Sequence, residues 1–145
     1  MKIIVYTDGG ARGNPGPAAI GVVFCNEMGE CFKKHSEFLG DNLTNNEAEY
    51  KAVILGLKKL KALLGKEKVK QADVEIRADS ELMVNQMNGK YKLSDERIQQ
   101  FFIAIWNLKT EFKSVSFKHI PREQNKEADK LVNIALDSEL PKTLF

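Results

Sequence analysis

The order in which strand-like and helix-like hydrophobic patterns follow one another is the strongest constraint on the fold. Three short apolar runs come first, without helical period, and helical and strand-like segments then alternate to the end of the chain. The expected strands cover residues 2–7, 19–25, 31–39, 73–78 and 115–119, and the expected helices cover about 45–64, 79–88, 94–112 and 125–136. This order, βββαβααβα, favours an α/β fold in which helices pack on a mixed sheet.

Local signals place several boundaries of these elements. Asp8 and the two glycines after it end the first strand, so residues 9–17 are expected to form a loop. Thr44 and Glu47 have the spacing of a capping box at the start of the first helix. Ser94 lies between two apolar residues spaced like a hydrophobic staple, which predicts that the third helix starts there.

Size and composition favour one compact domain over residues 1–145. The chain has 145 residues with 43% hydrophobic content, enough to form a core without disulfides. The apolar run at the start is too short for a signal peptide, and no segment approaches 18 apolar residues, so we expect a cytoplasmic protein. A net charge of +2 does not by itself identify a partner for polyanions.

The only two cysteines flank a predicted turn over residues 26–30. Cys25 and Cys31 could therefore face each other across a hairpin. A reducing cytosol favours free thiols, although the sequence leaves a disulfide open.

Four acids lie at the end of a predicted strand or on the core-facing side of a predicted helix: Asp8, Glu49, Asp79 and Asp129. Glu49 precedes apolar residues at offsets of 3, 4, 7 and 11, which places its carboxylate on the buried stripe of a helix, whereas Glu47 falls on the solvated face. Taken singly, Asp8 could be a turn residue, Asp79 an N-cap and Asp129 a favourable charge in the first turn of a helix.

Together the four acids predict a metal site. Strand ends and helix starts meet at one edge of such a sheet, and each of the four acids can reach that edge. Clustered carboxylates repel one another unless cations lie between them, and oxygen donors without cysteine or histidine favour Mg²⁺. This pattern indicates metal-assisted phosphate chemistry.

The motifs that carry these acids resemble those of the type 1 ribonuclease H family, in the same order and over nearly the whole chain. The matching segments are Tyr6-Thr7-Asp8-Gly9-Gly10, Gly13-Asn14-Pro15-Gly16-Pro17, Thr44-Asn45-Asn46-Glu47-Ala48-Glu49, Ala78-Asp79-Ser80 and Asn125-Lys126-Glu127-Ala128-Asp129. The resemblance implies a ribonuclease H-like fold with a five-stranded mixed sheet and helices on both faces.

The resemblance also implies a reaction and a set of site residues. Asp8, Glu49, Asp79 and Asp129 would hold two Mg²⁺ ions, or Mn²⁺ as a substitute, and hydrolyse the RNA strand of an RNA–DNA hybrid to 5′-phosphate and 3′-hydroxyl ends. The protein would act as a monomer, with double-stranded RNA as an alternative substrate. The residues that would contact the substrate are Gly9, Gly10, Arg12, Asn14, Thr44, Asn45, Asn46, Ser80 and Glu81.

The chain departs from the family pattern at residues that would assist catalysis or bind the substrate. Many members have a histidine ten residues before the last acid, and His119 has this spacing, so it is a candidate catalytic residue. Its position on the last strand favours packing at the strand end instead, in which case Arg122 or Glu123 would fill the vacant position. Glu81 replaces a glutamine that touches RNA. The basic handle between the second and third helices is missing, which leaves Lys90, Lys92 and Arg12 as the remaining phosphate partners.

Two other functions fit the same pattern. The fold could serve as an inactive nucleic-acid-binding module, or as an enzyme for other strand chemistry such as cleavage of double-stranded RNA or integration. A retained cluster of repelling carboxylates argues against an inactive module, because such a cluster destabilises a domain that binds no metal.

Overall fold

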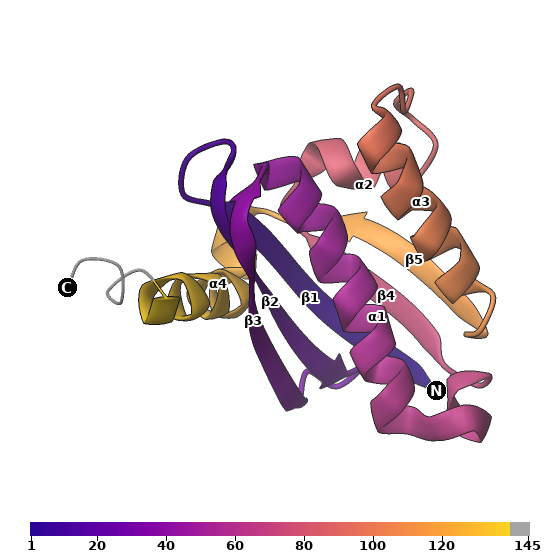
Figure 1. Cartoon of the computed structure of the whole chain (residues 1–145). Helices are drawn as coiled ribbons and strands as arrows, with labels where there is room; N and C mark the ends of the chain where they lie inside the picture. Colours follow the sequence, from indigo (N-terminus) through magenta and orange to yellow (C-terminus); the bar gives the residue numbers. More distant parts are fainter. Residues whose placement is uncertain (140–145) are drawn as a thin grey trace.

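The computed structural model describes residues 1–139 and confirms the predicted order of elements (Figure 1). The strands are β1 (Lys2–Ala11), β2 (Gly16–Asn26), β3 (Cys31–Leu43), β4 (Asp73–Ala78) and β5 (Ser114–His119). The helices are α1 (Asn45–Val69), α2 (Glu81–Met87), α3 (Glu96–Lys109) and α4 (Lys126–Glu139), with a short 3-10 helix η1 (Arg122–Gln124) before α4.

The five strands form one mixed sheet in the order β3-β2-β1-β4-β5. The first three strands are antiparallel neighbours, while β4 runs parallel to both β1 and β5. The main core lies between the sheet and α1, α2 and α3, and smaller clusters pack under α4 on the other face (Figure 1). The predicted five-stranded sheet with helices on both faces is therefore confirmed.

The first strand is longer than the sequence predicts. Gly9 and Gly10 do not end β1 but pair with Ile20 and Ala19 of β2, so the expected loop over residues 9–17 shrinks to residues 12–15. The glycine at position 9 is needed for helix packing, because a Cβ there would lie 2.2 Å from the carbonyl oxygen of Ala48 in α1. The strand continues through these glycines because β2 pairs with them, although the pairing with β4 has already ended at Thr7.

Replacing Gly9 with alanine is expected to destabilise the protein by about 1–3 kcal/mol, because the added methyl group pushes α1 away from β1. The matched control is Gly10→Ala, whose Cβ would meet only a side-chain methyl of Val132 at 3.6 Å, an ordinary contact. Urea unfolding of the two variants measures the difference. Equal stability of the two variants would show that the approach of α1 does not depend on Gly9.

Helix boundaries follow the capping chemistry, with two corrections. Thr44 caps α1, and its capping box with Glu47 is present as predicted. The helix continues past Gly65, where the backbone turns to a φ of 80°. The N-cap of α3 is Asp95 rather than Ser94, because the Asp95 carboxylate accepts hydrogen bonds from two backbone N–H groups in the first turn.

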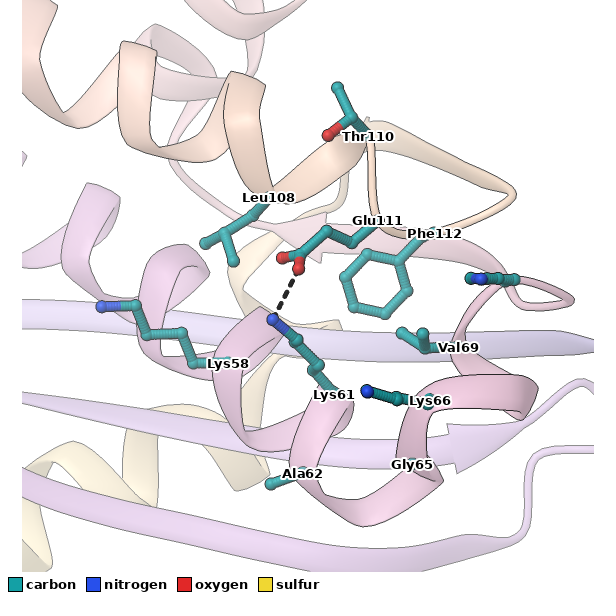
Figure 2. A pocket seen from close by; sticks show the side chains of 11 residues that line it. Lys58, Lys61, Ala62, Gly65, Lys66, Val69, Leu108, Thr110, Glu111 and Phe112 are labelled. Carbon is teal, nitrogen blue, oxygen red and sulfur yellow. Dashed lines mark hydrogen bonds and ion pairs between the residues drawn. The ribbon is translucent and has the colours of Figure 1, made fainter.

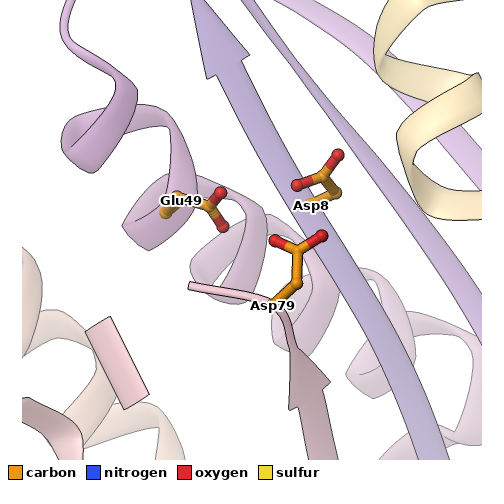
Figure 3. Close-up of side chains that lie close together, drawn as sticks. All are labelled: Asp8, Glu49 and Asp79. Carbon is orange, nitrogen blue, oxygen red and sulfur yellow. The ribbon is translucent and has the colours of Figure 1, made fainter. Parts of the chain in front are cut away.

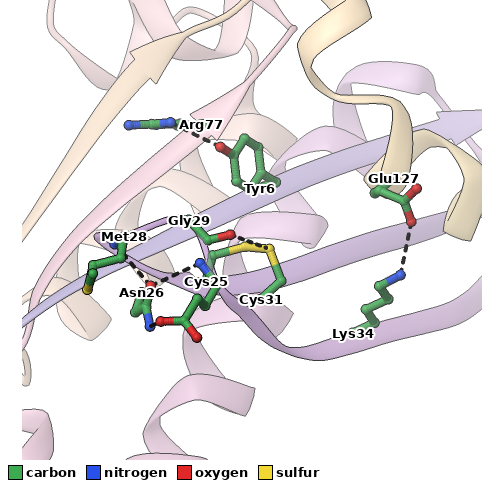
Figure 4. The surroundings of a disulfide bond; sticks show 10 residues. Tyr6, Cys25, Asn26, Met28, Gly29, Cys31, Lys34, Arg77 and Glu127 are labelled. Carbon is green, nitrogen blue, oxygen red and sulfur yellow. Dashed lines mark hydrogen bonds and ion pairs between the residues drawn. A yellow bond between two sulfur atoms is a disulfide. The ribbon is translucent and has the colours of Figure 1, made fainter.

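Cys25 and Cys31 form a disulfide across the β2–β3 hairpin (Figure 4). The expectation of free thiols is therefore wrong for this structure. The hairpin register places the two residues directly opposite each other, and this geometry outweighs the argument from the redox compartment.

Among residues 1–139, none of the helices has both the length and the apolar composition needed to span a membrane.

Candidate active site

The register of the parallel strands β1 and β4 sets two of the predicted acids side by side. Thr7 pairs with Ala78 at the end of this ladder, so Asp8 and Asp79 are the next residue on each strand. Asp79 then leads into α2, whose N-cap is Ser80. The two carboxylates therefore lie where the parallel pairing stops, at the edge where crossover sheets bind their ligands.

Glu49 joins them from α1, which crosses the same end of the sheet (Figure 3). Ligand oxygens of Asp8, Glu49 and Asp79 all lie within 4.8 Å of one another, and the side chains of Asp8 and Glu49 are buried. The helical position that the sequence assigned to Glu49 is confirmed. Three acids from three separate elements thus converge on one point.

Asp129 reaches the same pocket from α4, on the other face of the sheet. Asp129 does not belong to the group of three acids within 4.8 Å of one another. It is exposed and interacts with the Asp8 carboxyl. Asn125 anchors this part of the chain, because its buried side-chain amide donates to the carbonyl oxygen of Thr7 at 2.8 Å and its own carbonyl accepts from the Asp129 N–H. The residue before Asp8 is thereby tied to the first turn of the helix that carries Asp129.

Burial and mutual repulsion disfavour the ionised forms of these acids. Burial raises the pKa of Asp8 to about 8, and the charges of Asp79 and Asp129 add to this effect. Burial likewise raises the pKa of Glu49 well above its usual value, with the charges of Asp8 and Asp79 contributing in the same direction. The cluster therefore binds protons strongly when no cation is present.

The donor set fits a hard divalent cation. All three converging side chains offer carboxylate oxygens, and one buried oxygen of Glu49, Oε2, has no hydrogen-bond donor. A buried oxygen without a partner is costly, and a cation in the middle of the cluster would satisfy it while reversing the repulsion among the acids.

The acids open into a pocket of about 560 Å³ that also contains most of the predicted substrate-contacting residues. Gly9, Gly10, Arg12, Asn14, Asn45, Asn46 and Ser80 line it. The loop before β2 is held against α1 because the Asn45 N–H donates to the Asn14 side chain and the Asn45 side chain accepts from the N–H of Ala11. Among these residues, the amide oxygen of Asn46 is buried without a partner.

Three predicted residues do not line this pocket. Thr44 is occupied as the N-cap of α1, and Glu81 is exposed on the first turn of α2. His119 is exposed at the end of β5, so the expectation that it packs at the strand end is wrong, and it does not reach the acids either. Packing at this end of the strand is done by its neighbour Ile120, which is buried.

Arg122 lines the acidic pocket, whereas Glu123 lines a separate hollow beside Cys31. Of the two residues that the sequence left open for the vacant position, only Arg122 lines the acidic pocket. Asn133 was missed: it lies one helical turn after Asp129, where helical spacing could have identified it, and its side chain accepts from Arg12. Arg12 also forms an ion pair with Asp137 of α4, so its positive charge is partly neutralised.

Comparison with protein families gives a match over most of the chain. The model of the Reverse transcriptase-like family matches residues 6–135. Among solved structures, the LC11 RNase H1 from compost, in complex with an RNA/DNA hybrid, is 47% identical, with a TM-score of 0.89 over 95% of this chain and 99% of that one. The RNase H1 of Halobacterium salinarum is 36% identical with a TM-score of 0.86, covering 95% of this chain and 99% of that chain.

Two of the curated relatives are much longer than this chain. The Bifunctional protein Rv2228c of Mycobacterium tuberculosis is 32% identical over 95% of this chain, which spans only 36% of that protein. The Ribonuclease HI of Halobacterium salinarum is 37% identical over 94% of this chain, which spans 65% of that protein.

Proposed function

Because the chain belongs to the type 1 ribonuclease H family, we propose that it hydrolyses the RNA strand of RNA–DNA hybrids, leaving 5′-phosphate and 3′-hydroxyl ends. The convergence of Asp8, Glu49 and Asp79 within 4.8 Å carries the proposal. Such a cluster at the mouth of an open polar pocket is suited to binding cations against a phosphodiester, and the backbone of a hybrid supplies phosphates at regular intervals.

We assign the metal-binding role to Asp8, Glu49, Asp79 and Asp129, with two Mg²⁺ ions as the natural cofactor and Mn²⁺ as a substitute. When bound, the ions would activate the attacking water and stabilise the charge on the leaving oxygen. The four side chains position this chemistry from both faces of the sheet, and Asn125 keeps Asp8 and Asp129 in a fixed relation through its bond to Thr7.

Recognition of RNA is assigned to the amides beside the acids. The side-chain amides of Asn14, Asn45 and Asn46 line the pocket and are suited to hydrogen-bond a 2′-hydroxyl, which is the group that distinguishes RNA from DNA. Arg122 is the cation placed to meet a phosphate at the other side of the pocket. Contacts to sugar and phosphate carry little information about base sequence, so we expect cleavage at many positions.

The proposal is tested by mixing the protein with a hybrid, duplex RNA or duplex DNA, each carrying a label, in Mg²⁺, Mn²⁺ or EDTA. We expect cleavage only of the RNA strand in the hybrid and only with metal. Asp8→Asn should slow it by at least about a hundredfold. The matched control is Asp41→Asn, which changes an exposed acid on β3 and should retain activity.

Other outcomes separate the alternatives. Binding of the hybrid without cleavage in either metal would indicate an inactive binding module, and cleavage of duplex RNA would widen the substrate class. A cytoplasmic location and a monomeric state remain part of the proposal, and light scattering tests the second.

A further inference from the structure

The described part of the chain has a hollow that is larger than the acidic pocket. It lies at the opposite end of α1, between the C-terminal parts of α1 and α3, and has a volume of about 1160 Å³ (Figure 2). Its apolar floor includes Val69, Leu108 and Phe112, and its rim is basic. The hybrid hydrolysis proposed above does not use this surface.

A second, smaller hollow of about 300 Å³ continues the first around the end of α3, since Thr110 lines both. We call the two together the distal basic surface. Its charged residues are six lysines and one carboxylate: Lys58, Lys61, Lys66, Lys70, Lys109, Lys113 and Glu111. This local excess of five positive charges exceeds the +2 of the entire chain. Positive charge is therefore concentrated at the end of the molecule remote from the acids.

Most of this charge is not neutralised by neighbouring acids. Glu111 pairs with Lys61, and Asp73 lies 3.7 Å from Lys113. Within residues 1–139, the ammonium groups of Lys58, Lys66 and Lys70 meet no carboxylate. Three cations at the rim of one hollow repel one another, and an anionic ligand would relieve this repulsion.

The break in α1 at Gly65 shapes this rim. Gly65 has a φ of 80°, and no atom lies within 4 Å of the position where a Cβ would be. The glycine is thus required by the backbone turn and not by lack of space. Because the chain changes direction there, the short last part of α1, which carries Lys66 and leads to Lys70, lines the hollow instead of continuing straight into solvent.

An aromatic ring stands beside the lysines. Trp106 is 57% exposed on α3 and lines the smaller hollow. Its ring stacks on Phe102 at a centroid distance of 6.4 Å, and the ammonium of Lys109 lies 5.4 Å from its centroid. A large exposed ring held by a neighbouring ring and flanked by cations offers a flat surface for a planar partner.

We propose that the distal basic surface binds single-stranded nucleic acid, with phosphates on the lysines and a base stacked on Trp106. Unpaired lysines and an exposed aromatic ring are the two components of sequence-tolerant single-strand sites. A duplex meets the charge requirement but keeps its base faces covered. An acidic peptide meets the charge requirement but offers no base to the exposed face of Trp106. The combination of features therefore favours a single strand.

Trp106 is the only tryptophan in the chain, so its fluorescence reports directly on this surface. The probe is a 15-nucleotide oligothymidylate in EDTA, so that neither the metal site nor hydrolysis takes part. Titration should quench the fluorescence of Trp106 with saturation. Lys66→Glu/Lys70→Glu should weaken binding by about tenfold or more and reduce the salt dependence of log K by about 1.4.

The matched control is Lys33→Glu/Lys118→Glu, which makes the same change of charge at two exposed lysines outside both hollows. It should bind the oligonucleotide like the unmodified protein. Trp106→Ala, followed by anisotropy of a labelled oligonucleotide, should lose about 5- to 150-fold in affinity, as expected for one stacked base. Thermal unfolding of each variant checks that it is folded.

Three results would overturn the proposal: no quenching at low salt, an equal loss of affinity in the control variant, or displacement of the oligonucleotide by an acidic peptide that binds more tightly. Since the experiment contains no metal and no hybrid, its failure leaves the proposed hydrolysis untouched, and a failure of hydrolysis leaves this binding untouched.

Discussion

Replacing Glu49 with glutamine is expected to abolish hydrolysis and at the same time to stabilise the metal-free protein. Both effects have one cause. The Glu49 carboxylate is buried beside Asp8 and Asp79, and its pKa is raised by burial and by their charges, so its ionised form opposes folding when no cation is present. Glutamine keeps the shape but removes the charge that binds metal.

The stability gain is measured by thermal unfolding in EDTA at pH 8. Each kcal/mol of relieved repulsion should raise the melting temperature by roughly 2–4 °C in a domain of this size. The matched control is Glu27→Gln, the same chemical change at an exposed acid in the β2–β3 turn, which should alter neither property. If Glu49→Gln loses activity without any rise in melting temperature, repulsion among the acids is not what the metal relieves.

The stability of the metal-free protein is expected to fall as the pH rises. Asp8 has an ordinary pKa of 3.8, which is raised to about 8 in the folded protein by burial and then by the charges of Asp79 and Asp129. Between these values the folded state holds a proton that the unfolded chain releases, so stability is greatest below about pH 4 and is lost progressively up to about pH 8. Saturating Mg²⁺ should reverse this trend, because cations bind the deprotonated carboxylates.

Urea unfolding from pH 5 to pH 9 measures how the free energy of unfolding changes with pH, once in EDTA and once in Mg²⁺. Asp73, Glu75 and Glu127 have pKa values that their partners lower, so they remain ionised over this range and add no slope. The double variant Asp8→Asn/Glu49→Gln should give a flat profile that Mg²⁺ does not change. A flat profile for the unmodified protein in EDTA would contradict the account.

Local patterns in the sequence predicted the positions of most of the site, because each depends on a short segment. Helical spacing placed Glu49 on the buried stripe of α1. The predicted strand ends placed Asp8 and Asp79 together, which is correct for their position although β1 itself continues to Ala11. The order of elements followed from hydrophobic periodicity together with capping and turn signals.

Features that depend on contacts between distant segments were not predictable in this way. The extension of β1 through Gly9 and Gly10 depends on pairing with β2 and on the close approach of α1. The disulfide depends on an irregularity of the hairpin register after Phe24, which brings Cys25 opposite Cys31, and the sequence gives no sign of it. That Arg122 and not Glu123 lines the acidic pocket depends on how η1 turns before α4, and sequence spacing carries no such information.

The central claim is that the clustered carboxylates bind divalent cations, and calorimetric titration of the metal-free protein with Mn²⁺ tests it most directly. The account predicts saturable uptake that Mg²⁺ competes for, with proton release that increases below pH 8, and no uptake by Asp8→Asn/Glu49→Gln. Uptake of equal strength by that variant, or none by the unmodified protein, would contradict it.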